Sequence, residues 1–216
     1  MITPLKIKRN GNQVYLTSDL HLGHAREFLY GPRGYKNAQE HDDAVIAKIN
    51  EIVKPDDYLL FCGDFCLNTD LSAFKSYCFR ILCQNIIFIF GNHNNPSWAF
   101  YKTLVKERYN EDIEVYPYRW NNIVFVGESL DVEVDKYTFH LSHFPKLIWD
   151  KSHHGRAHGC GHSHGSCSKT LPDSKLSKVL DLGWDVFSRP ISVDEFRAIM
   201  DKKSVEKPDH HNKETT

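Results

Sequence analysis

The chain has no apolar run long enough to cross a membrane, since about 18 uninterrupted apolar residues would be needed. Its first residues also lack the charged-then-apolar order of a signal peptide, so we expect a cytoplasmic location. No Cys-x-x-Cys pair occurs among the six cysteines. The sequence therefore gives no support to a zinc ribbon or a thioredoxin-like redox site, and buried, reduced thiols are expected.

Neither sign of charge dominates the 216 residues: 27 lysines and arginines face 28 acidic residues, for a net charge of -1. This balance gives no support to a broad basic face that binds a polyanion, although it leaves a local basic cleft open. The sequence contains no internal repeat, linker or composition change that would mark a boundary. We therefore predict one domain over residues 1–201, followed by a disordered tail over 202–216 that has almost no apolar residues.

The order of apolar runs predicts an α/β protein. Strands and helices alternate in the first half, which indicates a βαβαβ unit with a parallel sheet, and short strands dominate the second half, which indicates added antiparallel strands. The turn signal Asn10-Gly11 predicts a hairpin between residues 5–8 and 13–17. The other predicted strands are 58–62, 85–90, 113–116, 123–126, 130–134, 137–141 and 178–182, and the predicted helices are 37–53, 71–82, 95–108 and 192–200.

Histidine is abundant, with thirteen residues, and histidine is a common metal ligand. Several histidines and carboxylates stand where predicted strands end, which is where ligands gather in open α/β sheets. One Asp-x-His triplet is common by chance, but five donor clusters in such places predict a metal site. Mixed nitrogen and oxygen donors suit Mn, Zn, Fe or Ni better than Ca. The clusters are Asp19 with His21, Asp64, Asn92 with His93, His143, and His162 with His164.

The order of these clusters resembles the calcineurin-like metallophosphoesterase superfamily, and is most similar to its small stand-alone bacterial and phage enzymes. The resemblance runs from about residue 13 to 184. It implies a four-layer αββα sandwich and, if a phage encodes the protein, a location in the host cytoplasm. The motifs that carry it are Asp19-Leu20-His21, Gly63-Asp64, Gly91-Asn92-His93, His143 and Gly161-His162-Ser163-His164.

The resemblance also implies a site for two divalent metal ions, with manganese expected first and zinc, iron or nickel as alternatives. A hydroxide that bridges the two ions would attack phosphorus, and His93 would act as the acid catalyst. In this assignment Asp19, His21 and His164 hold the first ion, Asn92, His143 and His162 hold the second, and Asp64 bridges both.

Three further residues are candidates for contact with the substrate. His24 either faces the substrate, or lies behind the ligands or on the surface, and the sequence leaves these readings open. Arg26 and Arg33 are candidates to clamp a phosphate, against the alternative that they are merely solvated. One position departs from the resemblance, because Asn94 stands where an acidic residue usually pairs with the catalytic histidine, which would make His93 less basic.

The substrate expected from these features is a small phosphodiester or phosphomonoester, with a nucleotide-like molecule favoured. No capping insertion covers the site, and the Val-Asp-Arg-Gly stretch of protein serine/threonine phosphatases is absent after Gly63-Asp64. A nuclease that acts on nucleic acid ends is one alternative, although the charge gives it no support. The other is a metal-binding scaffold that has lost catalysis, for which Asn94 is the evidence. No membrane partner is expected, and the sequence leaves the oligomeric state open.

Overall fold

The computed structural model describes residues 4–67, 70–93, 95–109, 114, 116–167 and 178–205. Outside these residues lie Asn94, residues 113 and 115 of the strand expected at 113–116, and the tail from 206. Within the part of the chain that the structure describes, no helix is both long and apolar enough to span a bilayer. All six cysteines are buried and carry free thiols, as expected.

A six-stranded sheet forms the centre of the molecule, in the order β11-β2-β3-β4-β6-β5. Strands β2, β3, β4 and β6 are parallel to one another, and the two edge strands β5 and β11 are antiparallel to their neighbours. The strands are β2 (Val14–Thr17), β3 (Tyr58–Phe61), β4 (Asn85–Phe88), β5 (Tyr118–Trp120), β6 (Ile123–Phe125) and β11 (Ile191–Ser192).

A second, five-stranded sheet has the order β1-β7-β8-β9-β10. Antiparallel pairs occur in the second half, as expected, at β5–β6 and β7–β8. However, β9 and β10 join in parallel, because long connections after β8 and β9 carry the chain back to the same end of the sheet. The strands are β1 (Leu5–Ile7), β7 (Ser129–Val134), β8 (Tyr137–Ser142), β9 (Ala157–Cys160) and β10 (Val179–Asp181).

The predicted hairpin at the start of the chain is wrong. Asn10 and Gly11 do form a turn, with φ of 51° and 95°. However, β1 pairs in parallel with β7 of the five-stranded sheet, where Leu5 lies opposite Val132. The side chain of Arg9 then donates to Asp135 at 2.6 Å. The turn therefore carries the chain from one sheet to the other instead of pairing β1 with β2.

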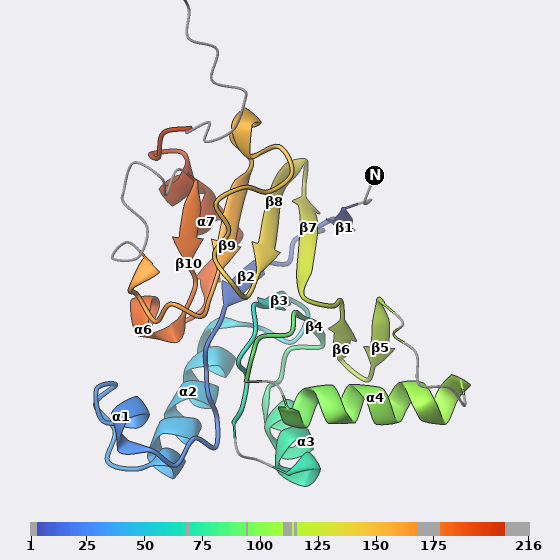
Figure 1. The fold of residues 1–216 in the computed structure, drawn as a ribbon, viewed down its shortest axis with the longest axis vertical. Coiled ribbons are helices and arrows are strands. Elements are labelled where there is room, and N and C mark those ends of the chain that lie inside the picture. The colour runs from blue at the N-terminus through green and yellow to red at the C-terminus, as the bar shows by residue number, and fades with distance from the viewer. Residues whose placement is uncertain are drawn as a thin grey trace, which may run out of the picture.

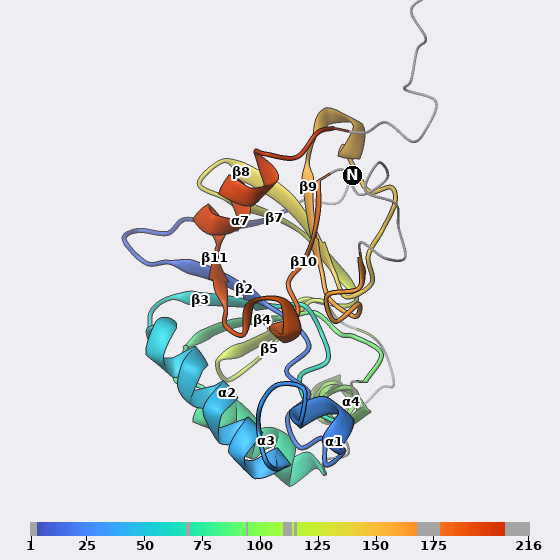
Figure 2. The ribbon, with the colours of Figure 1, turned by 90° about the vertical axis from the view of Figure 1, so that its left-hand side faces the viewer.

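Helices cover the outer face of the six-stranded sheet, and the five-stranded sheet lies on its other side (Figures 1 and 2). Predicted helices are present as α2 (Ala38–Ile52), α3 (Leu71–Arg80), α4 (Asn95–Tyr109) and α7 (Val193–Met200). Side chains cap two of these helices, because Asn37 Oδ1 accepts from the Glu40 amide and Ser192 Oγ accepts from the Glu195 amide. The described residues also include the short helical turns α1 (Glu27–Tyr30), η1 (Ser152–His154) and α6 (Trp184–Phe187).

Two hydrophobic cores hold these layers together. Strand β3 shows the division, because Leu59 and Phe61 face the core beneath the helices while Leu60 faces the core between the sheets. Alternate side chains of a strand point to opposite faces, so a strand that is apolar throughout is buried on both sides. Helix α7 contributes Phe196 and Met200 to the core between the sheets. The α/β sandwich with two sheets is thus confirmed.

Candidate metal centre

Five strands deliver polar side chains to one edge of the sandwich. Strands β2, β3 and β4 are parallel within the first sheet, and β8 and β9 are parallel within the second. Their carboxyl ends meet, so the residues that follow each strand lie close together (Figure 1). The donors predicted from the sequence are the residues that follow these ends: Asp19 and His21 after β2, Asp64 after β3, Asn92 and His93 after β4, His143 after β8, and His162 and His164 after β9.

The backbone at these donors is unusual. Asp19, His21 and Asp64 have φ of 57°, 54° and 57°, and His162 and His164 have φ of 68° and 46°. Non-glycine residues rarely adopt this region, and holding one there costs roughly 1–3 kcal/mol. Hydrogen bonds between the loops sustain the conformation, since the Asp19 amide donates to the Gly63 carbonyl at 3.0 Å and the His21 amide to the Asp64 carbonyl at 3.0 Å. Such strain is concentrated where a site requires side chains to be aimed.

Gly63 permits the close approach of the two sheets at this edge. Its φ is 95°, and a Cβ atom at this position would lie 2.6 Å from Nδ1 of His143 and 2.9 Å from Cα of Gly91. With no side chain in the way, His143 packs against the loop and its Nδ1 donates to the Cys62 carbonyl at 2.9 Å. The other ring nitrogen of His143, Nε2, therefore points into the site, where Oδ1 of Asn92 lies 2.8 Å away.

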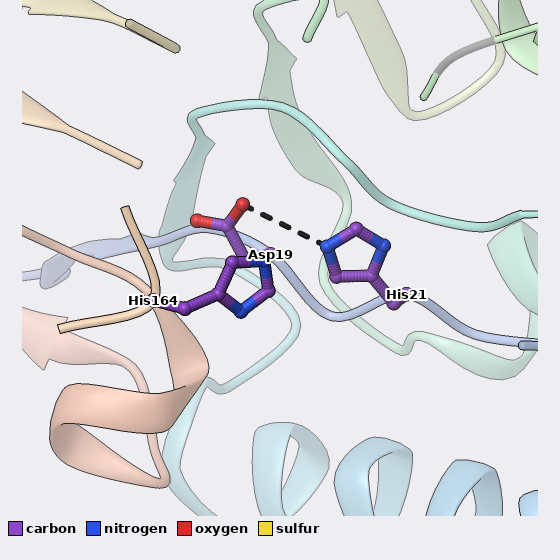
Figure 3. A group of neighbouring side chains, drawn as sticks. All are labelled: Asp19, His21 and His164. Atoms are coloured by element: carbon purple, nitrogen blue, oxygen red, sulfur yellow. Dashed lines mark ion pairs between the residues drawn. The ribbon is translucent and has the colours of Figure 1, made fainter. Parts of the chain in front are cut away.

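The first donor group consists of Asp19, His21 and His164, whose ligand atoms all lie within 4.8 Å of one another. Figure 3 shows the three side chains pointing toward a common space, with Asp19 Oδ1 at 3.9 Å from His21 Nε2. Both ring nitrogens of His21 are buried and have no hydrogen-bond partner. An unpartnered buried polar atom costs about 1–3 kcal/mol, so a ligand at this point would remove a penalty.

A second donor group joins the first through Asp19, and consists of Asp19, Asp64 and His143 within the same 4.8 Å limit. Oδ2 of Asp64 lies 3.4 Å from Nε2 of His143 and 3.7 Å from Nε2 of His21, between the two halves of the site. Oδ1 of Asn92 lies 2.8 Å from Nε2 of His143 and 2.9 Å from Nδ1 of His162. The predicted donors of both ions are thus brought together.

The electrostatics of these donors fit a cation. Burial raises the pKa of the Asp19 carboxyl to about 6. For Asp64, burial also acts to raise the pKa, but the hydrogen bond with His143 and the nearby charges outweigh it and the pKa is lowered. Burial lowers the pKa of His21 to about 3, which keeps its ring neutral and able to act as a ligand. Buried carboxylates beside the neutral imidazole of His21 form a donor set that suits divalent transition metals.

Asp185 belongs to the site but was missed in the sequence. Its Oδ2 lies 2.6 Å from Nδ1 of His164, and this hydrogen bond raises the pKa of His164. A carboxylate behind a metal-binding histidine fixes the ring and leaves its other nitrogen for the ligand. The available signal was position, because Asp185 follows Gly183 just after β10, another strand end.

Arg33 is held inside the protein rather than left free for a phosphate. Its side chain is only 4% exposed, and Nε and Nη2 donate to the two carboxylate oxygens of Asp185 at 2.8 and 2.7 Å. The same guanidinium donates to the carbonyls of Asp19 and Leu20 at 2.8 and 2.9 Å. Arg33 therefore ties the loop that bears Asp19 to Asp185, and Asp185 in turn positions His164.

Of the remaining predicted residues, His93 and His24 line one cavity of about 380 Å³ and Arg26 does not. His93 lines it with His21, their ring centroids 5.7 Å apart, and its backbone amide donates to Oδ1 of Asp64 at 2.9 Å. His24 is buried in the cavity wall, where its Nδ1 accepts from the Arg26 amide at 3.2 Å. Arg26 itself is exposed on the segment that leads to α1.

Comparison with known proteins shows which family carries this set of donors. A sequence profile of the calcineurin-like phosphoesterases matches residues 13–180, the span that carries all the donors. The chain belongs to the calcineurin-like phosphoesterase family. Among curated relatives of this calcineurin-like phosphoesterase, an uncharacterized protein of Methanocaldococcus jannaschii is 32% identical over 82 residues, which cover 38% of this chain. The match spans 47% of the length of that relative.

A solved structure supports the fold of this family member. The crystal structure of a protein of unknown function from Aquifex aeolicus aligns with a TM-score of 0.57 and 16% identity, over 87% of this chain and 99% of that one. At this identity the likeness concerns the fold alone. Membership in the calcineurin-like phosphoesterases, together with the Asp and His groups, supports a metal-dependent phosphoesterase in general.

Proposed function

We propose that this calcineurin-like phosphoesterase hydrolyses a phosphodiester or a phosphomonoester, with a nucleotide-like substrate favoured, and uses two divalent ions. The observation that carries the proposal is His21 of the first donor group, whose two buried ring nitrogens lack a hydrogen-bond partner although two carboxylates lie within 4 Å of Nε2. The residues that would hold the ions are Asp19, His21, Asp64, Asn92, His143, His162 and His164. Manganese is the first candidate, with zinc, iron and nickel as alternatives.

Two bound divalent ions would supply an activated water at neutral pH and neutralise charge on the phosphoryl oxygens. The chain prepares its donors for that role. His143 and His164 each commit Nδ1 to a protein acceptor, which leaves Nε2 facing the site. The carboxylate of Asp64 lies between histidines of both groups, which supports its assignment as the bridge.

His93 is the proposed acid catalyst. Its ring borders the cavity, while its backbone amide is anchored to the carboxylate of Asp64. From this place a protonated imidazole can give its proton to the leaving oxygen or stabilise charge on the phosphoryl group, and such groups contribute typically 10²–10⁴-fold. His24 lies in the wall of the same cavity and is a candidate for contact with the substrate.

The test is hydrolysis of bis(4-nitrophenyl) phosphate and of 4-nitrophenyl phosphate by the purified chain with added Mn²⁺. We expect turnover that a chelator abolishes and that Mn²⁺ restores. The matched variant is Asp64→Asn, which keeps the shape of the side chain but removes the negative charge between the two groups, and it should lose nearly all activity. A wild-type chain that binds two ions per molecule without turnover of either substrate would favour the scaffold alternative.

A further inference from the structure

Two separate cavities open beside the donor groups. The first, about 380 Å³, is the one lined by His21, His93 and Phe28. The second, about 560 Å³, is lined by Asn92, Trp98 and residues of the segments that flank β6. Among the residues that the structure describes, the two linings have no member in common. Space is therefore available on two sides of the same centre.

Each cavity borders a different half of the donor set. His21 and His164 of the first group line the first cavity, whereas Asn92 lines the second. Asn92 and His93 are neighbours in the chain, yet Asn92 lines the second cavity and His93 lines the first. A phosphoryl group at the donors would thus have one cavity on each side. A phosphomonoester carries one organic group and would leave one cavity empty, while a phosphodiester carries two and would fill both.

Aromatic rings line both cavities. Phe28 is 73% exposed at the first cavity, and its ring stands edge-on to the ring of His24 at 5.1 Å. Trp98 and Tyr116 line the second cavity, and both are partly buried against the core beneath the helices. Exposed aromatic faces bind nucleobases by stacking, with little preference among bases. The groups that fit these cavities are therefore flat rings.

The second cavity also carries negative charge. Glu114 and Glu128 are exposed along its lining, and no lysine or arginine occurs among its described lining residues. Two carboxylates would repel a further phosphate on the arm that enters, while they can accept hydrogen bonds from sugar hydroxyls or base amino groups. A long polyphosphate or nucleic acid strand would fit this side poorly.

Resting on the function proposed above, we propose that the substrate is a phosphodiester that joins two ring-bearing groups, such as a dinucleoside monophosphate. One ring packs beside Phe28, and the other, with no further phosphate, enters the cavity of Trp98, Tyr116 and Glu128. Hydrolysis breaks one ester P–O bond and forms one P–O bond from water, and a proton passes to the leaving oxygen. The products are a nucleoside monophosphate and a nucleoside. Phe28 and Glu128 are thereby specificity residues.

The wild-type chain with Mn²⁺ is first compared on a dinucleoside monophosphate, a nucleoside monophosphate and a single-stranded hexanucleotide, with methyl 4-nitrophenyl phosphate as the general phosphoester. We expect the highest kcat/KM for the dinucleoside monophosphate, by roughly tenfold or more over the mononucleotide. Equal values for these two, or a higher value for the hexanucleotide, would overturn the inference alone. Failure to hydrolyse any of the four would overturn the proposed function, and the inference with it.

Variants then test the two cavities. Phe28→Ala should raise KM for the dinucleoside monophosphate roughly tenfold, and Phe28→Trp should restore it, because a stacking face is worth about that much. Phe79→Ala is the matched control, since Phe79 is also an exposed phenylalanine (60%) but stands on α3. A terminal phosphate on one end of the dinucleoside should raise KM several-fold, and Glu128→Gln should reduce that penalty. An unchanged KM in Phe28→Ala would contradict the proposal.

Discussion

Two buried histidines, His21 and His158, differ in a way that separates a ligand site from a structural cluster. Both are nearly inaccessible, with 3% and 0% of their surface exposed. The two nitrogens of His158 face protein groups, because Nε2 accepts from the Lys146 amide at 3.2 Å and Nδ1 lies 3.3 Å from the His140 carbonyl. Those of His21 have no hydrogen-bond partner, and Nε2 lies 3.7 Å from Oδ2 of Asp64 and 3.9 Å from Oδ1 of Asp19. Burial alone does not mark a functional site, and the missing partners do.

The surroundings of His158 extend the same contrast. Its neighbour His140 has Asp131 at 2.8 Å from Nδ1 and Lys146 Nζ at 3.0 Å from Nε2. Arg156 closes the cluster with ion pairs to Asp131 at 3.2 Å and to Asp150 at 2.8 Å. Every titratable side chain there meets an opposite charge or a hydrogen-bond partner. Around Asp19 and Asp64, by contrast, both ring nitrogens of His21 are buried without a hydrogen-bond partner.

The largest expected effect comes from His21→Leu. The variant should lose bound metal and reduce kcat/KM by roughly 10³-fold, since the ions supply several kcal/mol of charge stabilisation. Its free energy of unfolding in chelator should be equal to or above that of the wild type, because no protein hydrogen bond is removed. Metal analysis and denaturant unfolding measure both. If metal-free His21→Leu were less stable than the metal-free wild type, His21 would have hydrogen-bond partners within the protein.

The matched variant His158→Leu should show the opposite pattern. It leaves the amide of Lys146 without its acceptor, which costs about 1–3 kcal/mol of the free energy of unfolding. The metal content should stay at the wild-type level, because His158 touches none of the donors. If fully folded His158→Leu protein lost its metal, His158 and His21 would not differ in the way proposed.

His93→Ala should separate catalysis from metal binding. We expect the metal content to be unchanged and kcat to fall by about 10²-fold or more, because the variant removes an acid without removing a ligand. His154→Ala, a histidine of η1 outside the cavity lining, serves as the control and should be as active as the wild type. Full activity in His93→Ala would exclude His93 from the reaction.

A smaller effect is expected at Asp185, which acts on the metal through His164. Asp185→Asn weakens the hydrogen bond at Nδ1 of His164 and should lower metal affinity 10–100-fold, as measured by calorimetry. The control is Asp194→Asn, which removes a carboxylate that pairs with Arg9 on the surface. An unchanged affinity in Asp185→Asn would show that His164 is positioned without this carboxylate.

The smallest effect, counted per pH unit, is a pH dependence of stability due to His158. Burial lowers the pKa of His158 to about 3, whereas the unfolded chain titrates it near the ordinary value of about 6.5. Below that value the unfolded state binds a proton that the folded state rejects, so His158 lowers the free energy of unfolding as pH falls from about 6.5 toward 3. The slope is about 1.4 kcal/mol per pH unit. Denaturant unfolding of metal-free protein should show a shallower decline in His158→Leu, and equal slopes would contradict the assignment.

Local elements were predictable because their determinants lie within a few residues. The start of α2 follows from Asn37 and Glu40, which bond across three residues, and the burial of β3 follows from its uninterrupted apolar run. The prediction of a hairpin was wrong because Asn10 and Gly11 specify a turn, whereas the strand that pairs with β1 is not determined by nearby residues. That choice depends on β7, more than a hundred residues away.

The sequence by itself determined which side chains stand at the ends of strands, and from their order the family and the donors of the metal site could be named. Only the tertiary structure decided which of these groups have partners. Arg33 and Asp185 are 152 positions apart in the sequence, yet they form a bidentate ion pair. Through this pair Arg33 holds the loop of Asp19 in place, and Asp185 positions the ring of His164. Likewise, His21 and His158 are both buried. The packing of the two sheets provides hydrogen-bond partners for His158 but none for His21. Hydrogen bonding of buried groups is set by long-range contacts, which a local pattern does not encode.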